Sequence, residues 1–291
     1  MPETTVGFIG LGVMGRPMAH NLLKRGFPLV VHSRSPGPVQ DLVSAGAEPA
    51  ASPADVARRA FRIVTMLPDS PDVESVMEGS GGVFGELQRG SLLIECSSIA
   101  PAVARRLAGR AAARGASMLD APVSGGEIGA QSATLSIMVG GDAEAFAAAR
   151  PILEAMGNPE RIIHIGPSGT GQLCKVCNQL VIGGTLAAVG EAFGLARRAG
   201  LDAAKMRSAL LGGFAASRVL EVHGDRILQE NYKPGFRTKL YQKDMRIAAD
   251  TLREYGAASP VTTLVRRLVD ELVADGGAER DYSAVATKLF D

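Results

Sequence analysis

The stretch Val6–Gly15 reads Val-Gly-Phe-Ile-Gly-Leu-Gly-Val-Met-Gly. Its first four residues form a short apolar run of the kind that builds a buried strand. Gly10, Gly12 and Gly15 follow with Gly-x-Gly-x-x-Gly spacing, and residues 17–25 continue as a helical pattern. Between a strand and a helix, this spacing is typical of a dinucleotide-binding loop, because glycine lets the backbone approach a pyrophosphate and lets the helix pack on the strand. The alternative is a turn that is merely rich in glycine.

The cofactor is therefore expected to contact the whole loop, which consists of Gly10, Leu11, Gly12, Val13, Met14 and Gly15. The second predicted strand is 29–32, and its end should meet the adenosine ribose. There the chain reads Ser33-Arg34-Ser35, with no carboxylate before Asp41. A guanidinium flanked by hydroxyls suits a 2′-phosphate, so the sequence predicts NADP, with NAD as the second choice. The alternative is a solvated surface arginine.

Further strand-like runs alternate with helical stretches, and they cover 63–67, 92–96, 118–121, 135–139 and 162–165. This alternation predicts an α/β fold with a mostly parallel sheet. Because ligands bind at the carboxyl ends of such strands, the segments after the runs are candidate site residues. Met66, Leu67, Pro68 and Ser98 are assigned to the cofactor, and Ser124, Gly125 and Gly126 offer a hydroxyl and backbone N–H groups to a substrate carboxylate. The latter segment could also be only a turn.

The pattern changes after residue 166, and from Gln172 onward it is helical with glycine-rich breaks. The sequence predicts two domains, a Rossmann-type NADP-binding domain at 1–166 and an all-α domain at 167–291 that starts with a long interdomain helix. That helix lies within Gly169–Gly200 and is apolar on nearly every face, which predicts burial all round.

Three polar residues interrupt the first turns of this helix. Lys175, Asn178 and Gln179 are three or four residues apart, so they share one side. A lysine in apolar surroundings is costly unless it is paired or used, because its charged form loses water. We interpret Lys175 as a proton donor beside an amide that grips a substrate oxygen. The alternative is a lysine that extends to solvent from the helix end.

The composition of the chain argues against several classes of binding partner. The formal net charge of the 291 residues is +1, which argues against nucleic acid. We expect no secretory signal, because the start at Met1–Thr5 has no basic n-region and no long apolar h-region. We expect no membrane span, because the most apolar run, Val176–Gly190, is interrupted by Asn178 and Gln179. The protein is therefore expected to be cytoplasmic. The cysteine pair Cys174 and Cys177 lies inside the helix and the histidines are scattered, so no metal site is predicted.

Taken together, four blocks of sequence resemble the β-hydroxyacid dehydrogenase family nearly end to end. They are Gly7–Ala19, Asp120–Gly126, Gly169–Gln179 and Lys243-Asp244. Within the family the chain is most similar to the tartronate semialdehyde reductases, which act on 2-hydroxy-3-oxopropionate. Two departures are Ala133, where the family usually has glycine, and Ser33-Arg34, where that reductase usually has an acid.

The resemblance implies a Rossmann domain, a long helix and an all-α domain that takes part in oligomerisation, as a homodimer or homotetramer. It implies that Lys175 is catalytic, that Ser124, Gly125, Gly126 and Asn178 hold the substrate, and that Lys243 reaches the cofactor. The expected activity is hydride transfer between a nicotinamide cofactor and a small β-hydroxy acid or its semialdehyde, with Lys175 as general acid and base.

Alternatives remain open at this stage. Besides tartronate semialdehyde, the candidate substrates are 3-hydroxyisobutyrate, succinic semialdehyde and glyoxylate. Imine reductases resemble this family but usually lack the lysine, so Lys175 argues against that activity. A cofactor-holding, non-catalytic module would leave Lys175 dispensable.

Overall fold

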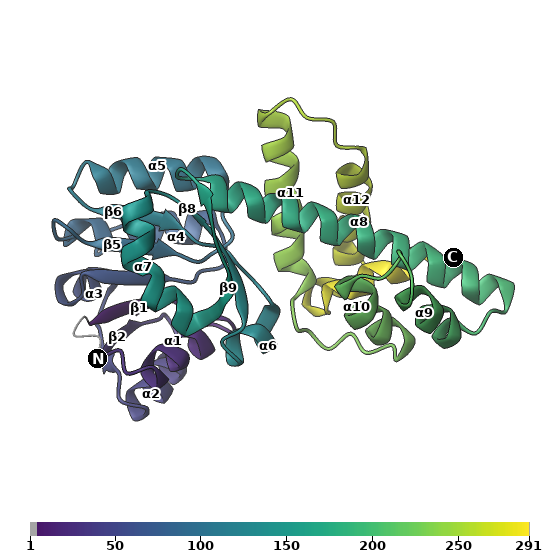
Figure 1. Cartoon of the computed structure of the whole chain (residues 1–291), viewed down its shortest axis with the longest axis horizontal. Coiled ribbons are helices and arrows are strands. Elements are labelled where there is room, and N and C mark those ends of the chain that lie inside the picture. The colour runs from purple at the N-terminus through teal and green to yellow at the C-terminus, as the bar shows by residue number, and fades with distance from the viewer. Residues whose placement is uncertain (1–4, 291) are drawn as a thin grey trace. The chain divides into compact units, whose positions relative to one another are not determined.

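The computed structural model describes residues 5–290 and divides into two compact units, one up to Lys175 and the other from Val176. The predicted fold class is confirmed, because a mostly parallel sheet with helices is followed by a long helix and a helical remainder (Figure 1). The sequence-based domain boundary after residue 166 coincides with the end of the last strand. The division by compactness lies further along, within the long helix α8 (Thr170–Ala199).

The first unit is built on nine strands: β1 (Val6–Ile9), β2 (Leu29–His32), β3 (Glu48–Pro49), β4 (Arg62–Thr65), β5 (Leu92–Glu95), β6 (Ser117–Asp120), β7 (Val123–Ser124), β8 (Leu135–Gly140) and β9 (Gly157–Gly166). Their order is β3-β2-β1-β4-β5-β6-β8-β7, and β9 pairs with β8. β8 pairs antiparallel with β6 and with β7, and the other strand pairs of the sheet are parallel, so the sheet is mostly parallel, as predicted. The short strands β3 and β7 were not predicted, because two residues leave no periodicity to detect.

Helices cover both faces of this sheet. They are α1 (Gly15–Lys24), α2 (Pro36–Ser44), α3 (Pro53–Arg59), α4 (Ser70–Glu78), α5 (Pro101–Ala112), α6 (Gly126–Gln131) and α7 (Ala143–Met156), with a short 3₁₀ turn at Val83–Gly85. Neighbouring strand residues face opposite sides: Phe8 packs with apolar residues of α1 and α7, and Ile9 packs with those of α3, α4 and α5. Burial of both faces explains why the strands read as continuous apolar runs.

The second unit is helical. Besides most of α8 it contains α9 (Ala203–Leu211), α10 (Arg218–Leu228), α11 (Thr238–Glu254) and α12 (Pro260–Ala274), with 3₁₀ turns at Gly277–Glu279 and Tyr282–Leu289. Its core joins Leu186, Val189 and Phe193 of α8 to apolar residues of α10, α11 and α12.

The expectation that the long helix is buried all round is wrong. Val181 is 70% exposed and Leu195 is 69% exposed, and Ala188 between them is also exposed. The spacing of seven residues puts these side chains on one stripe of α8, while the remaining apolar faces enter the core. The helix is also long and apolar enough to cross a membrane by length and composition, although half of its most apolar window is buried within the chain.

Candidate functional site

The parallel register aligns the ends of five strands. Ile9 lies beside His32 and Thr65, Thr65 lies beside Glu95, and Glu95 lies beside Asp120. The segments that follow these residues therefore begin at one edge of the sheet. This edge brings together most of the cofactor residues predicted from the sequence, namely Gly10–Gly15, Ser33 with Arg34, Met66–Pro68 and Ser98.

The glycine loop between β1 and α1 has the close packing that its spacing predicts. Gly10 has a φ of +98°, and a Cβ added there would lie 2.3 Å from the carbonyl oxygen of Met66. A Cβ at Gly15 would lie 1.9 Å from the carbonyl oxygen of Gly10. Gly12 is different, because no heavy atom lies within 4 Å of its added Cβ. Its open side leaves the room that a dinucleotide pyrophosphate needs at the start of α1, where Met14 provides no side-chain cap.

The residues after β2 lie beside this loop. The backbone N–H of Leu11 donates to Ser33 Oγ at 3.4 Å. Arg34 is 83% exposed at its side chain, and its guanidinium lies 3.7 Å from the carboxylate of Asp72 in α4. Ion pairs this exposed contribute little, so a phosphate could replace Asp72 as the partner at small cost.

The loops after β4 and β5 are tied to each other. The N–H of Leu67 donates to Ser97 Oγ at 2.7 Å, and the N–H of Ser97 donates to Glu95 Oε1 at 2.6 Å. Thr65 donates its hydroxyl hydrogen to the other oxygen of Glu95. These contacts hold the predicted segments 66–68 and Ser98 through Thr65, Glu95 and Ser97, none of which was predicted to contact the cofactor or the substrate.

Glu95 is fully buried at this edge. Burial raises the pKa of its carboxyl to about 7, although the hydrogen bonds from Ser97 and Thr65 favour the charged form. The charge of nearby Asp120 raises it further. Burial likewise raises the pKa of Asp120, against the N–H groups of Gly169 and Gln172 that bind its charged form. The signal that could have identified both residues is a carboxylate at the end of a mostly buried strand, in 92–95 and in 117–120.

The predicted carboxylate-binding segment lies where β7 ends. Ser124 pairs with Ser136 of β8, and Gly125 precedes α6 with a φ of +140°. Lys175 lies in the second turn of α8 and is only 9% exposed. This burial is what the interpretation as a functional lysine requires, and a lysine that extends to bulk solvent would be more exposed.

In the second unit, hydrogen bonds connect two further predicted residues. Asn178 Nδ2 donates to Gln179 Oε1 at 2.8 Å, and Gln179 Nε2 donates to Asp244 Oδ2 at 2.6 Å. The ammonium of Lys243 lies 2.7 Å from Asp244 Oδ1. Gln179 and Asp244 are both buried and join Asn178 to Lys243. Their linking role depends on the packing of α8 against α11 and carries no signal in sequence spacing.

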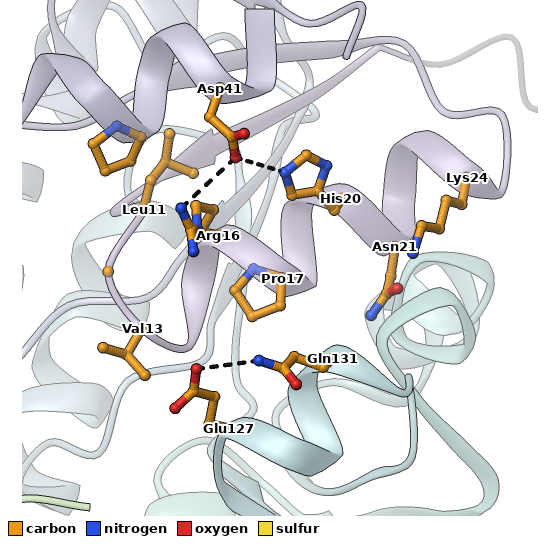
Figure 2. Close-up of a pocket in the computed structure, with 12 residues that line it drawn as sticks. Leu11, Val13, Arg16, Pro17, His20, Asn21, Lys24, Asp41, Glu127 and Gln131 are labelled. Atoms are coloured by element: carbon orange, nitrogen blue, oxygen red, sulfur yellow. Dashed lines mark hydrogen bonds and ion pairs between the residues drawn. The ribbon is translucent and has the colours of Figure 1, made fainter. Parts of the chain in front are cut away.

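A groove of about 640 Å³ opens beside the glycine loop (Figure 2). Its rim includes Leu11, Gly12 and Val13, and its other lining residues come from α1, α2 and α6. Asp41 pairs there with His20 at 2.8 Å and with Arg16 at 4.0 Å, and the hydrogen bond from His20 lowers the pKa of Asp41. Lys175 and Ser124 do not line this groove. Among residues 5–290, no group of three or more His, Cys, Asp or Glu residues is arranged to hold a metal.

Comparison with known proteins places this geometry in a defined class. Residues 5–166 match the NAD-binding domain of 6-phosphogluconate dehydrogenase, and residues 169–289 match the NAD-binding domain of NADP-dependent 3-hydroxyisobutyrate dehydrogenase. The chain is 42% identical to 2-hydroxy-3-oxopropionate reductase of Escherichia coli, over 98% of this chain and 96% of that protein. It is 40% identical to NAD-dependent L-serine dehydrogenase of Pseudomonas aeruginosa, over 98% and 97%.

A solved structure agrees with these matches. The 3-hydroxyisobutyrate dehydrogenase of Mycobacterium tuberculosis, determined with L-serine, superposes with a TM-score of 0.91 at 33% identity and covers 99% of both chains. The protein is thus an NAD(P)-dependent oxidoreductase that acts on CH–OH groups. It belongs to the β-hydroxyacid dehydrogenase family.

Proposed function

We propose that this enzyme catalyses reversible hydride transfer between NADP(H) and a short β-hydroxy acid or its semialdehyde. The substrate pair that the similarity favours is tartronate semialdehyde and glycerate, since 2-hydroxy-3-oxopropionate reductase matches at 42% identity. The roles of individual residues below belong to the same proposal.

The burial of Lys175 carries the proposal. Lys175 is 9% exposed, one turn beyond the start of α8. That start lies at the carboxyl edge of the sheet, because Asp120 at the end of β6 accepts hydrogen bonds from the N–H groups of Gly169 and Gln172. Lys175 therefore follows the edge where parallel sheets bind ligands, and it is shielded from bulk water there.

Each residue has a distinct task. Lys175 gives a proton to the substrate oxygen in reduction and takes it back in oxidation, and its positive charge stabilises the charge that develops on that oxygen. The hydroxyl of Ser124 and the N–H groups of Gly125 and Gly126 hold the substrate carboxylate. Asn178, three residues after Lys175 on α8, binds the same oxygen or orients the lysine. The nicotinamide coenzyme, when bound, supplies or accepts the hydride.

The coenzyme proposal favours NADP over NAD. Its binding residues would be the Gly10–Gly15 loop, Ser33, Arg34, Met66–Pro68, Ser98 and Lys243. The supporting feature is Arg34, a largely exposed guanidinium with one weak partner at the end of β2, where an acid would favour NAD. A smaller Michaelis constant for NADPH than for NADH is expected, and a clear preference for NADH would contradict the assignment.

L-serine is the second candidate substrate. It is itself a β-hydroxy acid, and both a relative at 40% identity and a solved structure at 33% identity are associated with it by name. Initial rates over a panel of tartronate semialdehyde, glycerate, L-serine, 3-hydroxyisobutyrate, succinic semialdehyde and glyoxylate, each with both coenzymes, decide between the candidates. The largest kcat/KM identifies the substrate, and absence of turnover with every member would refute the proposed activity.

The same proposal includes a homodimer or homotetramer in the cytoplasm. The apolar stripe of Val181, Ala188 and Leu195 on α8 supports self-association, because exposed apolar surface of this kind marks interaction sites. Two features favour α8 as a core helix over a membrane span. Half of its most apolar window is buried within the chain, and its polar residues Lys175 and Gln179 are buried as well.

Replacing Lys175 by Met tests the central role. The change removes the proton donor while keeping an unbranched side chain, and we expect kcat to fall by about 10²–10⁴-fold. The matched control is Lys205→Met in α9, whose lysine side chain is 86% exposed and should tolerate the change. Unchanged turnover of a folded Lys175→Met variant would assign the acid to another residue.

A further inference from the structure

The start of α8 is anchored by a buried carboxylate. Asp120 Oδ1 accepts from the N–H of Gly169 at 2.7 Å, and Asp120 Oδ2 accepts from the N–H of Gln172 at 2.8 Å. Asp120 is 2% exposed, at the last position of β6. A carboxylate at this place satisfies N–H groups that the first helical turn leaves without helical partners, and it interacts favourably with the helix dipole.

Close backbone packing makes the anchor rigid. A Cβ at Gly171 would lie 2.4 Å from the carbonyl oxygen of Met138 and 2.5 Å from that of Asp120. A Cβ at Gly140 would lie 2.6 Å from Asp120 Oδ1. The first turn of α8 is therefore in direct contact with the backbone of β6 and β8, and no side chain separates them.

Gln172 connects this turn to the loop after β5. Its Nε2 donates to the carbonyl oxygen of Ser97 at 2.7 Å, and its Oε1 accepts from the N–H of Ile99 at 3.1 Å. Gln172 is 1% exposed, so both bonds are shielded from water. Ser97 is in turn bound to Leu67 and Glu95. The side-chain amide of Gln172 thus binds the residues on both sides of Ser98, which is a predicted cofactor residue. The backbone of Gln172 belongs to the turn that precedes Lys175.

We infer that Asp120 and Gln172 are positioning residues, which hold Lys175 and the Ser97–Ile99 loop in one geometry at the edge of the sheet. The inference rests on the proposed role of Lys175. Lys175 follows Gln172 by three residues, so a shift or rotation of the first turn moves the lysine with it. Catalysis depends steeply on such placement, and a displacement of about 1 Å can cost on the order of 100-fold in rate.

The test replaces Gln172 by Met, which keeps the length of the side chain and removes both hydrogen bonds. We expect kcat at saturating NADPH to fall by about 10- to 100-fold, because Lys175 is displaced. NADPH affinity, measured by coenzyme fluorescence, should fall as well, because the variant also releases the Ser97–Ile99 loop. The pH dependence of kcat should also shift, because the displaced lysine meets a different environment. The matched control is Gln88→Met, since Gln88 also donates its amide to backbone carbonyls of the first unit, those of Ala57 and Arg58.

A double-mutant cycle separates positioning from general stability. If Gln172 acts on the chemical step through Lys175, adding Gln172→Met to Lys175→Met lowers kcat at saturating NADPH no further. An independent role gives the same loss of kcat in both backgrounds and overturns the inference. Wild-type turnover of Gln172→Met overturns it as well. Failure of the proposed function appears separately, as turnover that Lys175→Met alone leaves unchanged.

Hydrogen exchange supplies a readout that needs no activity, and its first part needs only the wild-type protein. In the wild-type protein the amides of Gly169 and Gln172 should be protected, because Asp120 accepts both. In Gln172→Met, exchange should accelerate in 97–99 and 169–175 and stay unchanged elsewhere in the sheet. Rapid exchange of Gly169 and Gln172 in the wild type would refute the anchor even if the variant fails to fold.

Discussion

Glu95 shows how a single side chain makes stability depend on pH. Its carboxyl is buried among Thr65, Ser97 and Asp120, and burial raises its pKa from 4.5 to about 7. The folded chain therefore holds this proton more tightly than the unfolded chain. As the pH rises from about 4.5 to 7, the contribution of Glu95 therefore lowers the free energy of unfolding. The total decrease over this pH range is on the order of 3 kcal/mol. Above about pH 7 the contribution of Glu95 no longer changes.

The variant Glu95→Gln keeps the shape of the side chain and has no charge to gain. Its unfolding free energy should exceed that of the wild type at pH 8, and the decline from pH 5 to pH 8 should be weaker. Urea denaturation at both pH values measures this difference. The surface variant Glu160→Gln, on an exposed part of β9, should follow the wild-type curve. Equal pH dependence in Glu95→Gln and the wild type would show that another group controls it.

At the scale of the element, the start of α8 leaves no room for a side chain at position 171. This start is pressed against the backbone of β6 and β8, so only glycine fits there. Gly171→Ala should destabilise the first unit by about 1–3 kcal/mol or more, because the atoms that a Cβ would meet belong to the backbone and cannot rotate away.

Gly109 in α5 is the matching glycine without this constraint. It is exposed, and an added Cβ there would meet no heavy atom within 4 Å. Gly109→Ala should therefore stabilise the protein by about 0.5–1 kcal/mol, since alanine loses less backbone entropy in a helix. Chemical denaturation of both variants compares the effects, and a neutral Gly171→Ala would contradict the close packing at the start of α8.

At the scale of the whole molecule, the stripe of Val181, Ala188 and Leu195 predicts self-association. Val181→Asp places a charge on this apolar stripe and should reduce the molecular mass in solution toward that of one chain. Size-exclusion chromatography with light scattering measures the mass. Phe61→Asp, at an exposed apolar residue of the first unit, should leave the assembly intact. A wild-type protein that is monomeric at micromolar concentration would refute the predicted oligomer.

Local patterns predicted a large part of the fold and proposed the residues of the candidate site. Short stretches of sequence are enough to recognise the glycine spacing at 10–15, the apolar runs of the strands and the helical remainder. The reason is that hydrogen bonding and periodicity in these elements are local. The burial of Lys175 also followed from the apolar composition of the residues around it. Similarity to known proteins then confirmed the family.

Only the tertiary structure decided how distant polar groups meet. Asp120 and Gln172 are separated by 52 residues, and Gln179 and Asp244 by 65, so no periodic signal connects them. The same holds for the stripe on α8: its residues are as apolar as the buried ones, and only packing determines which face other helices cover. The physical reason is that hydrophobic burial specifies how much of a surface is covered, whereas partner choice depends on the geometry of the assembled chain.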